Sequence, residues 1–141
     1  MDIIQQLRDE EGEILHAYQD HLGYWTIGVG ILIDKRKGGG LTREESAYIL
    51  DRRVRELERR VFDALPWARS LNEARQAVLI GMAFQMGMDG LMGFHNTLRF
   101  IKDRKFKEAA GNMLVSKWAS QTPGRAKRMA KQMETGEWVR K

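Results

Sequence analysis

The chain contains no cysteine among its 141 residues, which excludes a disulfide framework and a cysteine-ligated metal site. Its three histidines, His16, His21 and His95, are widely separated and lack the spacing of metal ligands. The longest apolar stretch, Ala77 to Phe84, is far shorter than the roughly 20 residues that span a bilayer. We therefore expect a globular protein without a metal or other cofactor and without stable insertion into a membrane.

A secretory signal peptide is also missing. Such a segment needs a basic start and an apolar run, whereas the first fifteen residues carry Asp2, Asp9, Glu10, Glu11 and Glu13. We therefore expect synthesis in the cytoplasm, so that any action elsewhere needs a separate route out.

What is present is the composition of a globular domain, with 43% hydrophobic residues, 30% charged residues and a net charge of +5. The charge is uneven: residues 1–34 carry −6, residues 35–100 carry +4 and residues 101–141 carry +7. The basic C-terminal part is compatible with a polyanionic partner such as nucleic acid, an anionic membrane surface or the cell wall. Taken by itself, the charge favours the ordinary explanation of a solvated helix face, and charge alone does not decide.

A first helix is predicted to begin near Asp2, which forms a capping-box pattern with Gln5, and to end at Gly12. Glu11 follows Leu7 by four residues on the apolar stripe and lies in the last turn, where the helix dipole opposes a negative charge. Burial and the dipole would both raise the pKa of Glu11, as a general acid near neutral pH requires. The alternative is an exposed helix end, with Glu11 one acid in a run of three.

Residues 14–33 are rich in β-branched and aromatic residues interrupted by glycines. This pattern is typical of short antiparallel strands, with tight turns near Gly23 and Gly30. Residues 34–40 combine charges with three consecutive glycines and predict a solvated loop.

The rest of the chain predicts helices. Thr42 with Glu45 forms a capping box before a long helix whose apolar residues recur in steps of three and four until Pro66. Ser70 with Glu73 forms another, before a stretch that is apolar nearly all round, as in a central buried helix. Shorter helices are expected near 94–101, 106–115 and 123–133, the last with Thr122 as N-cap.

These patterns predict an α+β fold in one domain, residues 1–141. A small antiparallel sheet lobe is expected at about 12–41 and a connecting helix at about 42–65. An all-helical lobe is expected at about 66–141, together with the N-terminal helix. We expect a monomer, because no exposed heptad pattern or large apolar face is evident.

Asp20 and Thr26 fall within the predicted sheet, and each alone has an ordinary explanation. Asp is common where a turn begins because its side chain accepts hydrogen bonds from nearby amides, and Thr is common in strands. Together with Glu11 they supply what glycoside hydrolysis needs: a proton donor, a second carboxylate and a hydroxyl that can hold the attacking water. The three residues meet only if the sheet packs back against the first helix.

The order of these residues resembles the active-site signature of the phage-type lysozymes, the endolysins of glycoside hydrolase family 24. That signature places a Glu, eight residues, an Asp, five residues and a Thr, which is the spacing of Glu11, Asp20 and Thr26. The resemblance extends over nearly the whole chain through an ordered set: Glu11-Gly12, Tyr18 to Asp20, Gly23 to Gly30, Phe84 to Gly87, Gly93-Phe94, Asn96, Leu98-Arg99, Ala109-Ala110, Trp118, Gln121 to Pro123, Arg125 to Arg128, Thr135-Gly136 and Trp138. It implies a lysozyme-like α+β fold.

The resemblance also implies an activity. A phage-type lysozyme is a muramidase that hydrolyses the β-1,4 bond between N-acetylmuramic acid and N-acetylglucosamine in peptidoglycan and so lyses the host cell. Glu11 would protonate the leaving oxygen, while Asp20 would stabilise positive charge on the sugar and, with Thr26, orient the attacking water, with inversion. The enzyme would reach the wall from the host cytoplasm after release by a separate pore-forming protein.

Further residues match family positions that line the saccharide cleft: Leu32, Phe84, Thr97 and Asn112. Each also has an ordinary explanation, Leu32 and Phe84 as core residues and the other two as polar residues on a helix surface. Arg125 matches an arginine beside the catalytic glutamate, where its charge would favour ionised Glu11 and partly offset the pKa rise argued above.

Two departures from the family pattern concern the small lobe. Ile31 follows Gly30 where the family usually has His, so an imidazole interaction that can support this lobe is absent. The loop 34–40 is shorter than in some relatives, which bears on substrate reach.

Two other functions remain open. A lytic transglycosylase cleaves the same bond without water and leaves an anhydro sugar, but such enzymes can work with Glu alone, so Asp20 and Thr26 argue against it. A non-catalytic module that binds the cell wall or nucleic acid through the basic lobe predicts salt-sensitive binding that survives loss of Glu11. The complete set of three residues argues against it. We expect peptidoglycan as the partner, no nucleic acid, and at most contact with an anionic surface.

Overall fold

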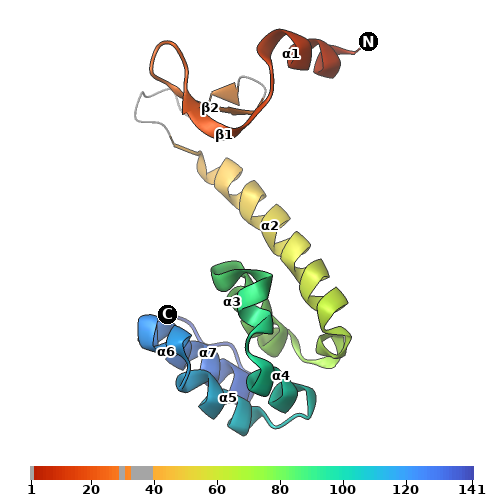
Figure 1. Ribbon diagram of the computed structural model, residues 1–141, viewed down its shortest axis with the longest axis vertical. Coiled ribbons are helices and arrows are strands. Elements are labelled where there is room, and N and C mark those ends of the chain that lie inside the picture. The colour runs from red at the N-terminus through yellow and green to blue at the C-terminus, as the bar shows by residue number, and fades with distance from the viewer. Residues whose placement is uncertain (1, 29–30, 33–39) are drawn as a thin grey trace. The chain divides into compact units, whose positions relative to one another are not determined.

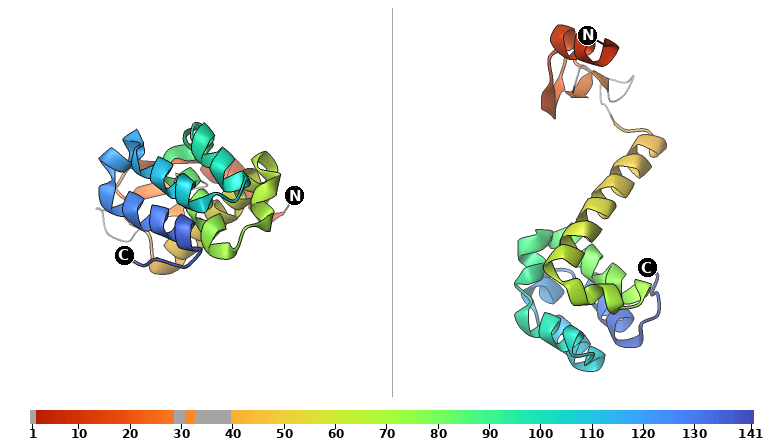
Figure 2. Two further views of the ribbon diagram at one scale, coloured as in Figure 1. Left: turned by 90° about the horizontal axis from the view of Figure 1, so that it is seen from below. Right: turned by 90° about the vertical axis from the view of Figure 1, so that its right-hand side faces the viewer.

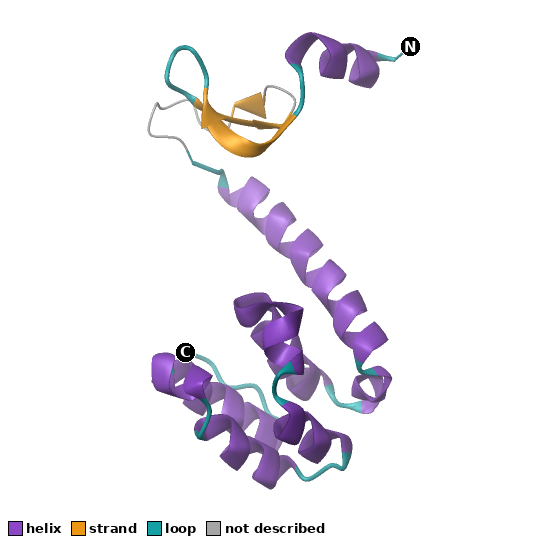
Figure 3. Ribbon diagram, in the orientation of Figure 1, coloured by secondary structure: helices purple, strands orange, loops and turns teal. Residues whose placement is uncertain are grey.

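The computed structural model describes residues 2–28, 31–32 and 40–141, without the side chain of Glu11. Within these residues the fold is α+β, as predicted: a three-stranded antiparallel sheet near the N-terminus is followed by helices (Figure 1). Figure 3 shows that the described chain from Arg43 onward contains only helices, loops and turns. The chain divides into two compact units, Met1–Asp51 and Arg52–Lys141.

The first unit begins with helix α1, Ile3–Glu11. The Gln5 backbone N–H donates to Asp2 Oδ1 at 2.8 Å, which confirms Asp2 as the N-cap. The Gln5 side chain donates to Asp9 Oδ1 instead, so only one half of the predicted capping box forms. Gly12 ends the helix at φ 70° and ψ 163°, a conformation essentially restricted to glycine.

The sheet has the order β1-β2-β3, with strands Ile14–Gln19, Trp25–Gly28 and Ile31–Leu32. Thr26 on the central strand faces Tyr18 on one side and Leu32 on the other. Gly23, at φ 88°, lies in the turn that joins β1 to β2, as predicted.

Two other expectations for this region, the turn at Gly30 and the loop over 34–39, lie outside the described residues. The expected grouping of the N-terminal helix with the helical lobe also stays a prediction.

Helix α2, Arg43–Ala64, begins as the sequence predicts. The Thr42 N–H donates to Glu45 Oε1 at 3.0 Å and the Glu45 N–H donates to Thr42 Oγ1 at 3.1 Å, so both halves of the capping box are present. The helix ends just before Pro66, which cannot continue its hydrogen bonding. Near this end, Val61 and Leu65 enter the core of the second unit.

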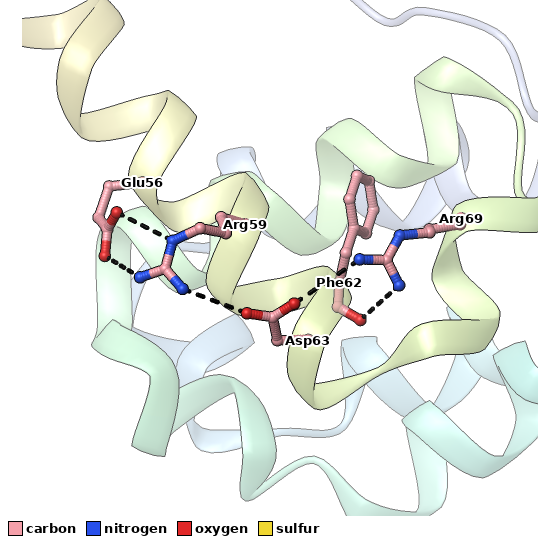
Figure 4. Close-up of polar contacts among 5 residues, drawn as sticks. All are labelled: Glu56, Arg59, Phe62, Asp63 and Arg69. Atoms are coloured by element: carbon pink, nitrogen blue, oxygen red, sulfur yellow. Dashed lines mark hydrogen bonds and ion pairs between the residues drawn. The ribbon is translucent and has the colours of Figure 1, made fainter.

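A chain of alternating charges joins the end of α2 to the short 3₁₀ helix η1, Pro66–Ser70 (Figure 4). Arg59 contacts Glu56 at 2.6 Å and Asp63 at 3.2 Å, and Arg69 contacts the second oxygen of Asp63 at 3.6 Å. Arg69 also donates to the Phe62 carbonyl and lies 5.6 Å from the centre of its ring. These ion pairs are exposed, so they add little to stability.

The start of helix α3, Glu73–Met92, corrects the prediction that Ser70 is its N-cap. Ser70 belongs to η1, where its hydroxyl donates to the Trp67 carbonyl at 2.8 Å. Because that 3₁₀ helix begins at Pro66 and extends through Ser70, α3 starts later, with Asn72 Oδ1 accepting from the Arg75 N–H at 3.0 Å.

Two side chains join the start of α3 to the end of α7, Pro123–Thr135. Arg75 donates from Nε to the Met133 carbonyl and from a terminal nitrogen to the Glu134 carbonyl, both at 2.8 Å. Asn72 donates to the Gly136 carbonyl at 2.9 Å. The last carbonyls of α7 are thus satisfied by residues some sixty positions earlier.

Helix α3 is interrupted at Gly87, whose φ of 78° and ψ of 169° lie outside the helical region. The remaining helices are α4, His95–Lys102; α5, Phe106–Leu114; and α6, Lys117–Gln121. The prediction missed α6. Thr122 is the N-cap of α7, as predicted, but its hydroxyl donates back to the Trp118 carbonyl at 3.0 Å and does not cap the helix. Pro123 does occupy the first turn of α7, as expected.

The core of the second unit lies among its helices, which Figure 2 shows from two further sides. Its largest fully buried side chains include Leu79, Leu91, Ile101, Met113 and Met133. In the described part of the chain, no single helix is long and apolar enough to cross a membrane; α3 and α4 reach that length and composition only as a pair bent by 102°.

Candidate active site

Asp20 lies at the start of the turn between β1 and β2, where the backbone holds its carboxylate. Asp20 Oδ1 accepts hydrogen bonds from the N–H groups of Leu22 and Tyr24, both at 2.9 Å. The Tyr24 amide does most to lower the pKa of Asp20; partial burial opposes it, and the Leu22 amide and His21 add to it. The side chain is therefore a carboxylate at neutral pH, and Oδ2 lies outside both of these hydrogen bonds.

Tyr24 links Thr26 to the same turn. Its carbonyl accepts from the Asp20 N–H at 2.8 Å and from the Thr26 hydroxyl at 3.2 Å. Thr26 is 4% exposed, and the bond to Tyr24 uses its only hydroxyl proton. The hydroxyl therefore offers lone pairs, so it can accept a hydrogen bond from a water molecule.

Leu32 is the one expected saccharide-contacting residue in this unit. It pairs with Thr26 across β2 and β3 and is exposed within its own unit. The structure thus places Thr26 and Leu32 on adjacent strands of one small sheet, with Asp20 in the turn that follows β1.

Glu11 is the last residue of α1, as predicted. The Gly12 N–H donates to the Arg8 carbonyl at 3.0 Å, and Arg8 forms an ion pair with Glu13 at 3.4 Å. The Glu11 side chain lies outside the description, so its approach to Asp20 and its raised pKa stay predictions.

The second unit contains an open pocket of 730 Å³. It is lined from α3, α4, α6, the end of α5 and the turns between them: Gln85, Met86, Gly90, Gly93, Phe94, His95, Asn96, Asn112, Val115, Ser116, Lys117, Trp118, Gln121 and Thr122. None of these lining residues is acidic, and two of them, Lys117 and His95, are basic. Its chemistry suits a ligand with amide, hydroxyl and acidic groups.

Sequence reasoning did not identify most of this pocket as a site. Trp118 and Phe94 form an edge-to-face pair with ring centres 6.0 Å apart. Trp118 Nε1 donates to Gln85 Oε1 at 2.9 Å, which fixes the indole beside the kink at Gly87. The available signal was the ordered resemblance, which includes all four residues.

Asn112 is the expected saccharide-binding residue that lines the pocket. Thr97 is 1% exposed, so it is not a helix-surface residue, and its hydroxyl donates to Asn112 Oδ1 at 2.5 Å. This bond holds the Asn112 amide by its oxygen and leaves the amide nitrogen to donate to a ligand. Thr97 therefore positions Asn112 instead of lining the pocket itself.

Phe84 and Arg125 are not among the residues that line the pocket. Phe84 is 50% exposed within the helical unit. Arg125 is half-buried and donates to the Gly81 carbonyl at 3.4 Å. Its predicted place beside Glu11, and the contact of Phe84 with saccharide, stay predictions.

Comparison with known proteins gives a consistent result. The family model "Phage lysozyme" matches residues 8–134. The chain is 29% identical to "Probable T4-type lysozyme 1" of Dictyostelium discoideum, covering 95% of this chain and 94% of that protein.

Two phage proteins match through only part of their own length. The pre-baseplate central spike protein of Enterobacteria phage T4 is 30% identical over 96% of this chain and 28% of its own length. A peptidoglycan hydrolase of Pseudomonas phage phiKMV is 33% identical over 83% of this chain and 13% of its own length. Taken with the small sheet, the helical unit and the order of Glu11, Asp20 and Thr26, these matches show that the chain belongs to the phage lysozyme family and is a cell-wall hydrolase of the lysozyme type.

Proposed function

We propose that this enzyme hydrolyses the β-1,4 bond between N-acetylmuramic acid and N-acetylglucosamine in bacterial peptidoglycan, and that it does so with Glu11, Asp20 and Thr26. The observation that carries the proposal is the turn in which Tyr24 holds both Asp20 and Thr26. This turn supports an ionised Asp20 carboxylate next to a Thr26 hydroxyl that offers lone pairs. Such an arrangement suits hydrolysis by an activated water.

In this mechanism Glu11 donates its proton to the glycosidic oxygen as the bond breaks. The Asp20 carboxylate, free at Oδ2, stabilises positive charge on the sugar ring and accepts a proton from the attacking water. The other O–H of that water donates to the Thr26 hydroxyl, which orients the water oxygen toward the anomeric carbon. Water attacks the face opposite the leaving group, and the configuration inverts.

The pocket of the second unit supports binding of a peptidoglycan strand. The Phe94–Trp118 pair offers an apolar surface, and the neighbouring amides and hydroxyls match the acetamido groups of the sugars and the peptide bonds of the stems. Asn112, oriented by Thr97, provides a donor in a fixed direction.

The test compares native protein with Glu11→Gln in the clearing of purified peptidoglycan. The variant keeps the shape of the side chain and lacks the acid, so we expect activity to fall by at least about 100-fold while the circular dichroism spectrum stays the same. Glu10→Gln, one residue away, is the matched control and keeps full activity. Equal clearing by native protein and Glu11→Gln contradicts the assignment of Glu11, and binding without clearing by the native protein identifies a wall-binding module instead.

Lysis of the host, synthesis in the host cytoplasm and release by a separate pore-forming protein remain part of this proposal. Expression in a bacterium with and without a pore-forming membrane protein tests them, because lysis should require both proteins.

A further inference from the structure

Methionine is the only sulfur-containing residue type of this chain, which has eight methionines and no cysteine. Reversible oxidation at sulfur can therefore occur only at methionine, where it converts a flexible apolar side chain into a polar sulfoxide. Three of the described methionines are buried in the helical core, which shields their sulfur atoms from oxidants in solution: Met82, Met113 and Met133. Four others are half-buried: Met86, Met88, Met92 and Met129.

Met86 differs from the other described methionines in its position. It alone among them lines the open pocket of 730 Å³. Its side chain also packs against the helical core, so Met86 lies at the boundary between core and pocket. An oxidant small enough to enter the pocket can therefore reach Met86 while the helical unit stays folded.

Gly90 adds to this accessibility because it has no side chain. Met86 directly precedes the interruption of α3 at Gly87, where φ is 78° and ψ is 169°. A Cβ atom placed on Gly90 would lie 2.5 Å from Met86 Cβ and 3.9 Å from Met86 Sδ. A side chain at position 90 would therefore displace Met86 or cover its sulfur, and glycine does neither. Both residues line the same pocket.

We propose that Met86 is a site of reversible oxidation by peroxides, and that its sulfoxide is a less active form of the enzyme. With hydrogen peroxide, the sulfur lone pair attacks one peroxide oxygen, so that an S–O bond forms and the O–O bond breaks. The proton of the transferred oxygen goes to the leaving oxygen, which departs as water. The sulfur is oxidised by two electrons, and the peroxide is reduced by the same two.

The reverse step needs a separate protein, because this chain has no cysteine. Two thiols of a methionine sulfoxide reductase supply the two electrons and become a disulfide, while the sulfoxide oxygen leaves as water. Met86 then returns to its apolar form.

The sulfoxide changes the pocket through its oxygen, which is a hydrogen-bond acceptor. The core against which Met86 packs offers no partner for it, since an unpaired polar group in apolar surroundings is unfavourable. The oxygen must therefore project into the pocket, which Phe94 and Trp118 line with an apolar surface. This inference rests on the proposed action on peptidoglycan, because it assigns a means of regulation to the same pocket.

The first measurement is the order in which the methionines are oxidised. Native protein is treated with dilute hydrogen peroxide, the peroxide is removed with catalase, and sulfoxides are located by tandem mass spectrometry. We expect Met86 to be oxidised before the other half-buried methionines. The three core methionines should react only when the protein is unfolded in denaturant.

The second measurement is the clearing of purified peptidoglycan by the same samples, each expressed relative to its own untreated protein. Native protein should lose activity in step with oxidation of Met86, by at least about tenfold at completion, because the pocket then holds a polar group in apolar surroundings. Methionine sulfoxide reductases that act on both epimers, supplied with a thiol reductant, should restore the activity.

Two leucine variants locate the effect. Met86→Leu has a similar volume and no sulfur, so it should keep its own activity through the peroxide treatment. Met129→Leu, on α7 and outside the pocket lining, is the matched control and should lose activity as native protein does.

A third variant separates polarity from oxidation. Met86→Gln introduces a polar side chain of similar length, so without any peroxide it should clear peptidoglycan more slowly than Met86→Leu. Melting temperatures show whether all three variants fold.

Several results would overturn the inference. It is wrong if Met86 is not among the first methionines oxidised, if complete oxidation of Met86 leaves clearing unchanged, or if Met86→Leu loses as much activity as native protein. Failure of the proposed function has a different signature, since untreated native protein would then not clear peptidoglycan. The order of oxidation, which needs no enzyme activity, would still test the site at Met86.

Discussion

The two units of this protein differ in how they are built. Among the described residues of Met1–Asp51, Thr26 is the one buried side chain, and the candidate catalytic turn is held by backbone hydrogen bonds. Arg52–Lys141 instead has a continuous apolar core beneath a preformed pocket. Hydrogen bonds that orient a carboxylate need little core, whereas a pocket that keeps its shape needs a packed scaffold. Chemistry and stability should therefore respond to different substitutions.

The largest expected effect is on catalysis by the first unit. Asp20→Asn keeps an oxygen to accept from Leu22 and Tyr24 but removes the charge. We expect the rate of peptidoglycan cleavage to fall by at least about 100-fold, with only a small decrease in melting temperature. Asp9→Asn, an exposed aspartate on α1, is the matched control. A rate within a few-fold of native protein would remove Asp20 from the mechanism.

The second unit should show the reverse behaviour. Leu91 is fully buried in its core, so Leu91→Ala should lower the free energy of unfolding by about 2–5 kcal/mol. Leu15, exposed on β1, should tolerate the same change within about 0.5 kcal/mol. Denaturant titration measures both, and assays well below the melting temperature should find kcat unchanged in each. Equal destabilisation by the two variants would erase the contrast between the units.

A pair of glycines sharpens the comparison within the helical unit. Gly87→Ala should lower the free energy of unfolding by about 1–3 kcal/mol, because its φ of 78° and ψ of 169° are strained for any other residue. Gly111→Ala should instead raise it by about 0.5–1 kcal/mol, because its backbone is helical and the space is open. If both changes shift stability in the same direction, backbone geometry does not distinguish the two positions.

The smallest expected effect is the pH dependence that Asp20 adds to stability. Its pKa is lowered in the folded state, so its stabilising contribution is complete above the pKa of the unfolded chain and is lost as the pH falls through the folded value. The difference in unfolding free energy between native protein and Asp20→Asn should thus shrink toward zero in acid. A difference that grows as the pH falls would contradict the hydrogen bonds at Oδ1.

Local sequence patterns predicted the presence of helices and strands better than the residues at which they begin. Both hydrogen bonds of the predicted capping box form between Thr42 and Glu45 at the start of α2. At the start of α3, by contrast, the Ser70 hydroxyl bonds within the 3₁₀ helix that begins at Pro66, and Asn72 is the cap instead. Thr122 likewise donates from its N–H and its hydroxyl to the Trp118 carbonyl, and these bonds depend on α6, which is too short to show a clear apolar period.

The candidate site divides in the same way. The turn around Asp20 is formed by residues close together in the sequence, and their residue types predict a turn there. The pocket is not local: Gln85 meets Trp118 across thirty-three positions, and Thr97 meets Asn112 across fifteen. Such pairs depend on how α3 to α6 pack, so periodicity alone could not assign Thr97 to a buried position that orients its neighbour.

The most direct test of the central claim is the mass of the products when native enzyme digests peptidoglycan in water enriched in heavy oxygen. Hydrolysis with Asp20 and Thr26 holding the attacking water predicts muramic acid ends that carry one heavy oxygen. Anhydro ends, lighter by one water and free of label, would contradict the account and identify a lytic transglycosylase.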